Sequence, residues 1–101
     1  MIGIDITSIK RFENKTEQFA KTILSDAEFI AWKESGQKAL FLAQRWSIKE
    51  AIFKANNKYH NFHNIDIVRQ SNGKFSFENF EISTSKEDDY VVAFVLEGKY
   101  A

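Results

Sequence analysis

The 101-residue chain contains no cysteine and no proline, and only four glycines. The absence of cysteine excludes a disulfide framework, a cysteine-ligated zinc site and thiol catalysis. No apolar run approaches the roughly 20 residues that a membrane-spanning helix needs, and the N-terminus lacks the basic and apolar regions of a secretory signal. Because linker-like composition and internal repeats are also missing, the sequence predicts a single cytoplasmic domain over residues 1–101.

A strong charge of either sign is missing as well, because 14 basic side chains balance 14 acidic ones. Residues 1–60 carry a net charge of +3, and residues 61–101 carry −3. This asymmetry is too mild for a non-specific nucleic-acid binder, although it permits a basic patch on the N-terminal half. Hydrophobic residues make up 44% of the chain, and ten of them are phenylalanine. That is enough for one thin core, so we expect several copies to associate.

The periodicity of the hydrophobic residues predicts an α+β fold. Residues 2, 4 and 6 are isoleucine and alternate with Gly3, Asp5 and Thr7, which is typical of a strand in which Asp5 points away from the isoleucines. The predicted helices cover residues 8–14, 16–24, 25–34 and 37–57. A capping box at Ser25 and Glu28 begins the third helix, and good helix formers dominate the last and longest one.

Strand-like segments occupy the remainder of the chain. They cover residues 65–69, 75–77, 80–82 and 90–96. Between the first two, Asn72-Gly73 favours a type I′ hairpin turn. Because helices come first and strands follow, we expect an antiparallel β-sheet packed against a long central helix and shorter helices, with the N-terminal strand joining the sheet or standing at its edge.

Two acidic residues stand out as candidate metal ligands. On the long helix, Glu50 and Lys54 share one face with Trp46, and the simplest reading is an exposed ion pair worth about 0.5 kcal/mol or less. Because that helix is unusually apolar, Glu50 would need a cation, a metal or hydrogen-bond donors. Asp5 is unusual because Asp is depleted in strands, although it could cap a strand end or lie exposed. Two separated carboxylates meeting over a phosphate group are typical of Mg²⁺.

The same helix supplies cations that suit phosphate oxygens, namely Arg45, Lys49 and Lys54. The alternative is an ordinary solvated helix face. No glycine-rich phosphate loop is present. His60 and His63 have no third ligand at metal-site spacing and are interpreted as loop residues.

Several segments resemble the holo-[acyl-carrier-protein] synthases, the small group of 4′-phosphopantetheinyl transferases. Residues 1–6 and 10–12 resemble the family's Gly-hydrophobic-Asp-Ile segment and its basic-aromatic continuation. Residues 41–55 resemble its Phe-Leu-Ala-Gly-Arg-Trp-x-x-Lys-Glu-Ala-x-x-Lys-Ala helix, and residues 65–74 and 90–95 resemble its Asn-Gly-Lys turn and last strand. The similarity covers most of the chain.

The resemblance implies an enzyme that moves the 4′-phosphopantetheine group of coenzyme A to a serine of apo acyl carrier protein. The reaction releases adenosine 3′,5′-bisphosphate and serves fatty acid and lipid biosynthesis. By the same resemblance, Asp5 and Glu50 bind Mg²⁺, and Lys54 contacts the pyrophosphate and stabilises developing charge. Either Glu50 or a metal-bound water held by Asp5 helps to deprotonate the serine.

The resemblance also implies further contacts. The additional coenzyme A contacts are expected at Arg45, Lys49, Lys58, Ser83 and Lys86. Lys10 and Arg11 are expected to meet the acidic helix of the carrier protein, which suits the positive N-terminal half. Family members are typically trimers with sites at subunit interfaces, so a homotrimer is expected, without nucleic acid or membrane partners.

The sequence departs from the family pattern at several points. Gln44 stands where the family usually has Gly, residues 56–60 replace a glycine-bearing loop, and Lys86 replaces a phosphate-contacting His. A lysine binds phosphate but does not carry protons at neutral pH as His does. One alternative is therefore a non-catalytic α+β module that binds an acidic protein or a nucleotide. Another is an RNA-binding domain with exposed Phe75 and Phe77, which the absence of a basic sheet face disfavours.

Overall fold

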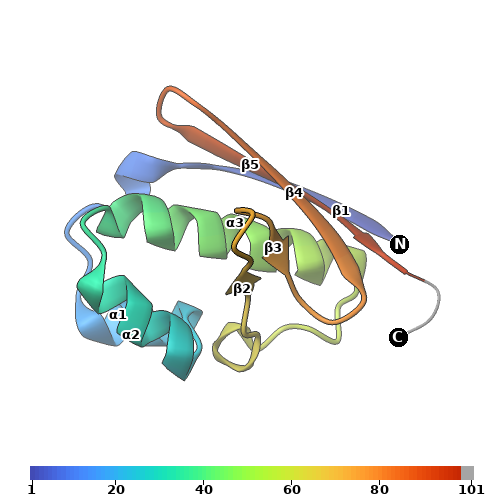
Figure 1. Cartoon of the computed structure of the whole chain (residues 1–101), viewed down its shortest axis with the longest axis horizontal. Helices are drawn as coiled ribbons and strands as arrows, with labels where there is room; N and C mark the ends of the chain where they lie inside the picture. Colours follow the sequence, from blue (N-terminus) through green and yellow to red (C-terminus); the bar gives the residue numbers. More distant parts are fainter. Residues whose placement is uncertain (99–101) are drawn as a thin grey trace.

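The structure is a computed structural model that describes residues 1–98 (Figure 1). Its elements follow one another as β1 (Ile2–Ser8), η1 (Ile9–Phe12), α1 (Glu17–Ile23), α2 (Asp26–Glu34), α3 (Lys38–Ala55), η2 (Phe62–Asn64), β2 (Val68–Arg69), β3 (Phe75–Ser76), β4 (Phe80–Glu87) and β5 (Tyr90–Glu97). Figure 1 shows the sheet lying across one side of α3, with α1 and α2 on the other side. None of the helices in this part of the chain has the length and apolarity to cross a membrane.

The main sheet has the order β1-β5-β4, and both strand pairs are antiparallel. The predicted antiparallel sheet against a long central helix is therefore confirmed. The N-terminal strand β1 forms one edge and β4 forms the other. In the register, Asp5 pairs with Ala93, and Ser83 pairs with Phe94 on the opposite side of β5.

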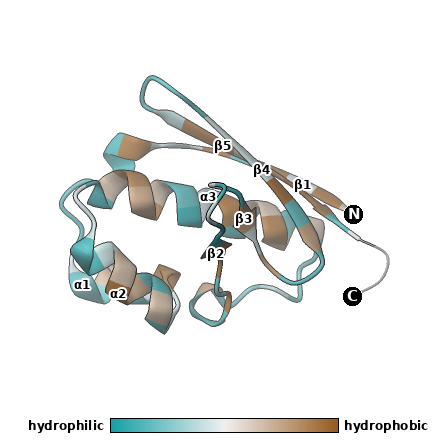
Figure 2. Cartoon of the chain, viewed as in Figure 1, coloured by the Kyte–Doolittle hydropathy of each residue, from teal (hydrophilic) through white to brown (hydrophobic). Residues whose placement is uncertain are grey.

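The alternation of residues in β1 separates two faces. Gly3, Asp5 and Thr7 face α3, as do the buried side chains of β5, which are Val91, Ala93 and Val95. The isoleucines face outward, and Ile2, Ile4 and Ile6 are 61, 58 and 63% exposed. Asp5 thus points away from the isoleucines, as predicted. Figure 2 shows hydrophobic colouring recurring along β1 and β5.

Gly3 brings the backbone of β1 into contact with α3. A Cβ atom built on Gly3 would lie 1.8 Å from the carbonyl oxygen of Ala51 and 3.0 Å from the backbone nitrogen of Ala55. No larger residue fits between the strand and the helix at this point. Because Asp5 follows on the same face, its side chain is held against the adjacent turn of α3.

The predicted helices form with shorter ends, and local caps explain their starts. The Thr16 hydroxyl accepts a hydrogen bond from Phe19 N at 3.1 Å, which caps α1. At the start of α2 the predicted capping box is present in both directions between Ser25 and Glu28. The helix expected over residues 8–14 is a single 3₁₀ segment, η1.

The strand predicted over residues 65–69 forms only at β2, and its partner β3 is equally short. Ile65 and Ile67 are buried in the core formed with α3, so their alternation reflects packing on a helix. The backbone N–H of Ile67 donates to Glu28 Oε2 at 3.1 Å. Because a side chain satisfies this donor, no strand ladder is needed there.

The turn between β2 and β3 also differs from the prediction. Gly73 has φ of 86°, and its N–H donates to the Gln70 carbonyl at 2.9 Å. A type I′ turn needs positive φ at two consecutive residues, whereas Asn72 is not among the described residues with positive φ. The turn is instead a longer loop that closes with Gln70 N donating to the Lys74 carbonyl at 2.6 Å.

Candidate active site

Asp5 and Lys54 form an ion pair between β1 and α3. Lys54 Nζ lies 3.2 Å from Asp5 Oδ1 and donates to the Ile4 carbonyl at 3.0 Å. The other carboxylate oxygen, Asp5 Oδ2, is buried and has no hydrogen-bond partner among the described residues. Lys54 therefore pairs across the strand with Asp5, whereas the simple helix pairing of Glu50 with Lys54 is not formed.

Glu50 belongs to the same electrostatic cluster. Burial raises the pKa of Glu50 above its ordinary value, and the charge of Asp5 raises this pKa further. Lys54 and Arg11 oppose that shift. Within residues 1–98, the side chain of Glu50 forms no ion pair and no hydrogen bond. Asp5 and Glu50, called here the carboxylate pair, thus hold more negative charge than Lys54 balances.

The chemistry of the carboxylate pair fits a magnesium ion. No group of three or more His, Asp or Glu side chains in the described part of the chain could enclose a metal. Mg²⁺ is commonly bound by only one or two protein carboxylates, with waters and substrate phosphate oxygens as its other ligands. Asp5 and Glu50 are both partly buried and have carboxylate oxygens free to accept, so they can supply the two protein ligands of such an ion.

Arg11 lies beside this cluster. Its guanidinium carbon is 4.9 Å from the centre of the Trp46 ring and 5.4 Å from that of Phe12. Trp46 stands one helical turn before Glu50 on α3. In the described part of the chain no carboxylate forms an ion pair with Arg11. Lys10, the neighbouring candidate for partner binding, is also exposed.

The position of Lys49 does not fit the coenzyme A contact that was expected for it. It is fully buried, and its Nζ donates to the carbonyls of Ile23 and Phe62 at 2.7 and 2.9 Å and to Glu28 Oε1 at 2.5 Å. These three bonds use all three ammonium hydrogens. Burial lowers the pKa of Lys49, and Glu28 opposes that shift. Lys49 therefore has no donor free for a coenzyme A phosphate.

Arg45 shares the same buried carboxylate. Its Nε donates to Glu28 Oε2 at 3.1 Å, and its guanidinium lies 4.4 Å from the Phe41 ring centre and 4.8 Å from that of Phe75. Burial lowers the pKa of Arg45, and Glu28 again opposes the shift. The sequence analysis identified Glu28 as a capping residue but missed that it also binds these two buried cations. The spacing of four residues between the two cations was the available signal, because it places them on one helix face.

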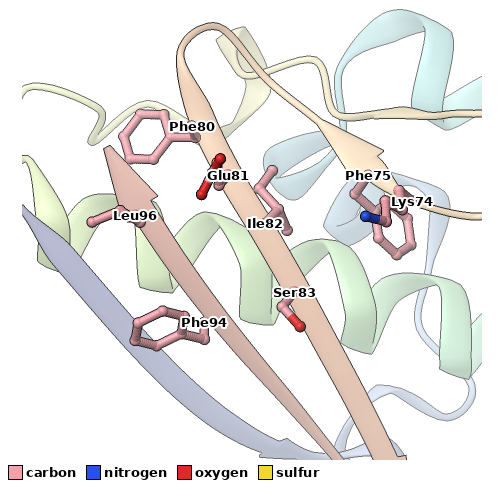
Figure 3. Close-up of a pocket in the computed structure, with 8 residues that line it drawn as sticks. All are labelled: Lys74, Phe75, Phe80, Glu81, Ile82, Ser83, Phe94 and Leu96. Atoms are coloured by element: carbon pink, nitrogen blue, oxygen red, sulfur yellow. The ribbon is translucent and has the colours of Figure 1, made fainter. Parts of the chain in front are cut away.

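A second polar region lies at the β4 edge of the sheet. Arg69, Lys74, Ser83 and Thr84 contribute to the lining of a hollow of about 460 Å³. Figure 3 shows an adjoining hollow of about 430 Å³, in which Lys74 comes from the β3 side and Ser83 from β4. Two cations and two hydroxyls suit phosphate oxygens. Sequence reasoning identified Ser83 here but missed Arg69 and Lys74.

Lys58 and Lys86 lie apart from both regions. Lys58 lines a separate hollow near the end of α3, together with Tyr59, Asn79 and Glu97. Lys86 is exposed on β4, where it pairs with Val91. One chain therefore brings together Asp5, Glu50, Lys54 and Arg11, but it leaves Lys58, Ser83 and Lys86 elsewhere on the surface.

Comparisons with known proteins agree with this architecture. The sequence profile of the 4′-phosphopantetheinyl transferase superfamily matches residues 1–95. A holo-[acyl-carrier-protein] synthase of Mycoplasma mobile is 48% identical over 97 residues, which cover 96% of this chain and 88% of the relative.

Two solved structures extend the agreement to the fold. The holo-[acyl-carrier-protein] synthase of Neisseria meningitidis has a TM-score of 0.86 and 30% identity over 97% of each chain. The enzyme of Bacillus anthracis, in complex with CoA (3′,5′-ADP), has a TM-score of 0.79 and 28% identity, and the match covers 93% of this chain and 91% of that one. The resemblance indicated by the sequence motifs is thereby confirmed, and this chain is a transferase that belongs to the 4′-phosphopantetheinyl transferase superfamily.

Proposed function

We propose that this protein transfers the 4′-phosphopantetheine group of coenzyme A to a serine of apo acyl carrier protein in a Mg²⁺-dependent reaction. The products are holo acyl carrier protein and adenosine 3′,5′-bisphosphate, and the holo carrier serves fatty acid and lipid biosynthesis. Family membership supports the transfer from coenzyme A to a carrier protein. The observation that carries the proposal for this chain is the carboxylate pair with Lys54 beside it.

The carboxylate pair is our candidate magnesium site. Mg²⁺ bound by Asp5 and Glu50 would supply Lewis-acid stabilisation of charge on the pyrophosphate oxygens of coenzyme A. Lys54 is half-exposed and already neighbours Asp5, so its ammonium can contact the same pyrophosphate and stabilise the charge that develops during transfer. The proton of the attacking serine goes either to Glu50 or to a water held by Asp5.

Arg11 and Lys10 are our candidates for recognition of the carrier protein. Stacking on Trp46 and Phe12 holds the guanidinium of Arg11 close to the carboxylate pair without using its hydrogen bonds. An arginine with free donors can bind a carboxylate in a bidentate manner. An acidic group of the carrier bound at Arg11 would therefore present the neighbouring serine to the carboxylate pair.

We propose that coenzyme A extends from the carboxylate pair to the β4 edge of a second copy. In one chain, Asp5 on β1 and Ser83 on β4 are separated by β5, which corresponds to about 10 Å across the sheet. They also face opposite sides of it. Lys58 and Lys86 remain candidates for phosphate contacts in this shared site, whereas Arg45 and Lys49 support α3 from its buried side.

The exposed sheet face supports association into a homotrimer. Five large apolar side chains of β1 and β5 lie on it, and Ile2, Ile4, Ile6, Phe94 and Leu96 are 61, 58, 63, 42 and 41% exposed. Cross-strand pairing joins Ile2 to Leu96 and Ile4 to Phe94, so the patch is continuous. Contiguous apolar surface of this kind marks an interaction site.

Mass spectrometry of the carrier protein tests the activity directly. The protein is incubated with apo acyl carrier protein, coenzyme A and Mg²⁺, and the carrier is expected to gain the mass of one phosphopantetheine group. Chelation of the metal, or the change Glu50→Gln, should suppress this gain. If the carrier binds but gains no mass at any Mg²⁺ concentration or pH, the protein is the non-catalytic binding module and the transferase proposal is wrong.

A further inference from the structure

The boundary between β1 and α3 carries Asp5 of the carboxylate pair and two polar neighbours, Thr7 and Ser47. Asp5 and Thr7 come from β1 and lie two residues apart on the same face, which is about 7 Å along a strand. Ser47 comes from α3, and its hydroxyl donates to the Asp5 carbonyl at 3.3 Å. That carbonyl belongs to the peptide bond leading toward Thr7, so the Ser47 hydroxyl lies at the stretch of β1 that carries both side chains.

Two atoms at this boundary are left without partners. Asp5 Oδ2 and Thr7 Oγ1 are the buried side-chain polar atoms that lack a hydrogen bond within residues 1–98. Thr7 is only 5% exposed. A buried polar group without a partner is costly, because the stability of a small domain is only a small difference between large terms. Both atoms belong to side chains two residues apart on one face of β1, a spacing that one shared partner can bridge.

We propose that Thr7 is a positioning residue for Asp5, acting through one ordered water that bridges Thr7 Oγ1 and Asp5 Oδ2. This inference rests on the proposed role of Asp5 as a metal ligand. The Ser47 hydroxyl gives the water a third polar partner, and about three partners is usual for a buried water. With Oδ2 held by the water, Oδ1 faces the cation, which in this structure is the Lys54 ammonium.

A hydroxyl in this position affects the metal without touching it. Partners that orient a metal ligand typically change metal affinity 10–100-fold when they are removed. Thr7 therefore belongs to the site although its side chain neither binds the cation nor reaches the substrate. Loss of the hydroxyl would leave the Asp5 carboxylate free to rotate about its side-chain bonds, and metal binding would then have to overcome that added freedom.

The change Thr7→Val tests this inference because valine has nearly the shape of threonine and lacks the hydroxyl. Titration of the protein with Mn²⁺, followed by electron paramagnetic resonance without coenzyme A or carrier, gives the metal dissociation constant. We expect Thr7→Val to raise this constant about 10-fold and Thr7→Ser to keep it within about 2-fold of the unsubstituted protein. Thr22→Val is the matched control, because the exposed Thr22 hydroxyl bonds only the Phe19 carbonyl of its own helix, α1.

Several results would overturn the inference. If Thr7→Val binds Mn²⁺ as tightly as the unsubstituted protein and melts at a higher temperature, the hydroxyl is merely unsatisfied. If Thr7→Val does not fold, a high-resolution crystal structure of the unsubstituted protein decides. A water within about 3.2 Å of both atoms supports the proposal, and an ordered site without one contradicts it. Asp5→Asn distinguishes failure of the proposed metal site from failure of the proposed role of Thr7. Unchanged Mn²⁺ affinity in that variant would refute the metal site itself.

Discussion

Glu50 shows how a single ionised residue can lower the stability of the metal-free fold in a candidate metal site. Its pKa is raised from the ordinary value of 4.5, chiefly by burial and next by Asp5. The folded state therefore binds this proton more tightly than the unfolded state, and the resulting stability is lost as pH rises through the folded pKa. At neutral pH the ionised Glu50 destabilises the metal-free fold, and a bound cation would offset that effect.

The change Glu50→Gln tests both parts of this argument. We expect the variant without metal to melt at a higher temperature than the unsubstituted protein at pH 7, and the difference to shrink as pH falls toward 4.5. Its transferase activity should fall by about 100-fold or more. Calorimetry with a chelator, combined with the mass assay, measures the two quantities. Asp88→Asn, in the exposed β4–β5 turn, is the control and should change neither. A less stable Glu50→Gln at pH 7 would contradict the electrostatic argument.

Gly3 illustrates a residue whose role depends on close approach to a helix. A methyl group there would meet the Ala51 carbonyl oxygen at 1.8 Å, and backbone atoms cannot move aside cheaply. We therefore expect Gly3→Ala to lower the free energy of unfolding by about 3 kcal/mol or more. Gly36→Ala is the control, since nothing lies within 4 Å of its added methyl group. Urea denaturation gives the free energy of unfolding of both variants. If Gly3→Ala loses no more than Gly36→Ala, β1 can move away from α3 at little cost and the close approach is not important for stability.

At the scale of whole elements, one carboxylate joins three segments of the chain. Glu28 on α2 accepts hydrogen bonds from Arg45 and Lys49 on α3 and from the backbone of Ile67. Another side of α3 carries Glu50, which faces Asp5 on β1. The rotation of this helix is therefore fixed on one side by the buried ions, which sets where Glu50 lies.

Lys49→Met measures the contribution of that buried network. Removing the lysine leaves two carbonyls without their donor and Glu28 with one fewer cation, so we expect a loss of about 3–5 kcal/mol in the free energy of unfolding. Lys38→Met, an exposed lysine of the same helix, is the control. At a temperature where the variant stays folded, the KM for coenzyme A should change little. A large rise in KM without loss of stability would instead favour direct phosphate contact by Lys49.

The elements also show what sequence reasoning could reach. Helices with local caps, such as α2, were predicted because their signals lie within a few residues of one another. The strand predicted over 65–69 was wrong in extent, because Ile67 bonds to Glu28, which is 39 residues away. Likewise, the motifs indicated Asp5 and Glu50, whereas Arg69 and Lys74 were missed because only the folded chain brings them beside Ser83.

At the scale of the whole molecule, the sheet has two chemically different edges. The carboxylate pair lies at the β1 edge, and the hollow with Arg69, Lys74 and Ser83 lies at the β4 edge. The apolar face formed by β1 and β5 is exposed between them. If a second copy covers that face, the same contact that buries the isoleucines also brings a β4 edge toward a carboxylate pair. Assembly and activity would then depend on one surface.

Ile4→Glu tests that dependence. Ile4 is 58% exposed in the middle of β1 and pairs with Phe94, so a charge there is tolerated in a single chain but is desolvated and unpaired in an interface. We expect the variant to sediment as a monomer, to keep its helical circular dichroism, and to lose about 100-fold or more in activity because each site lacks its second copy. Ile30→Glu is the matched control, since Ile30 is 62% exposed on α2, away from the sheet. An Ile4→Glu variant with the same assembly state as the unsubstituted protein, or a monomer with full activity, would show that the isoleucine face does not couple assembly to the site.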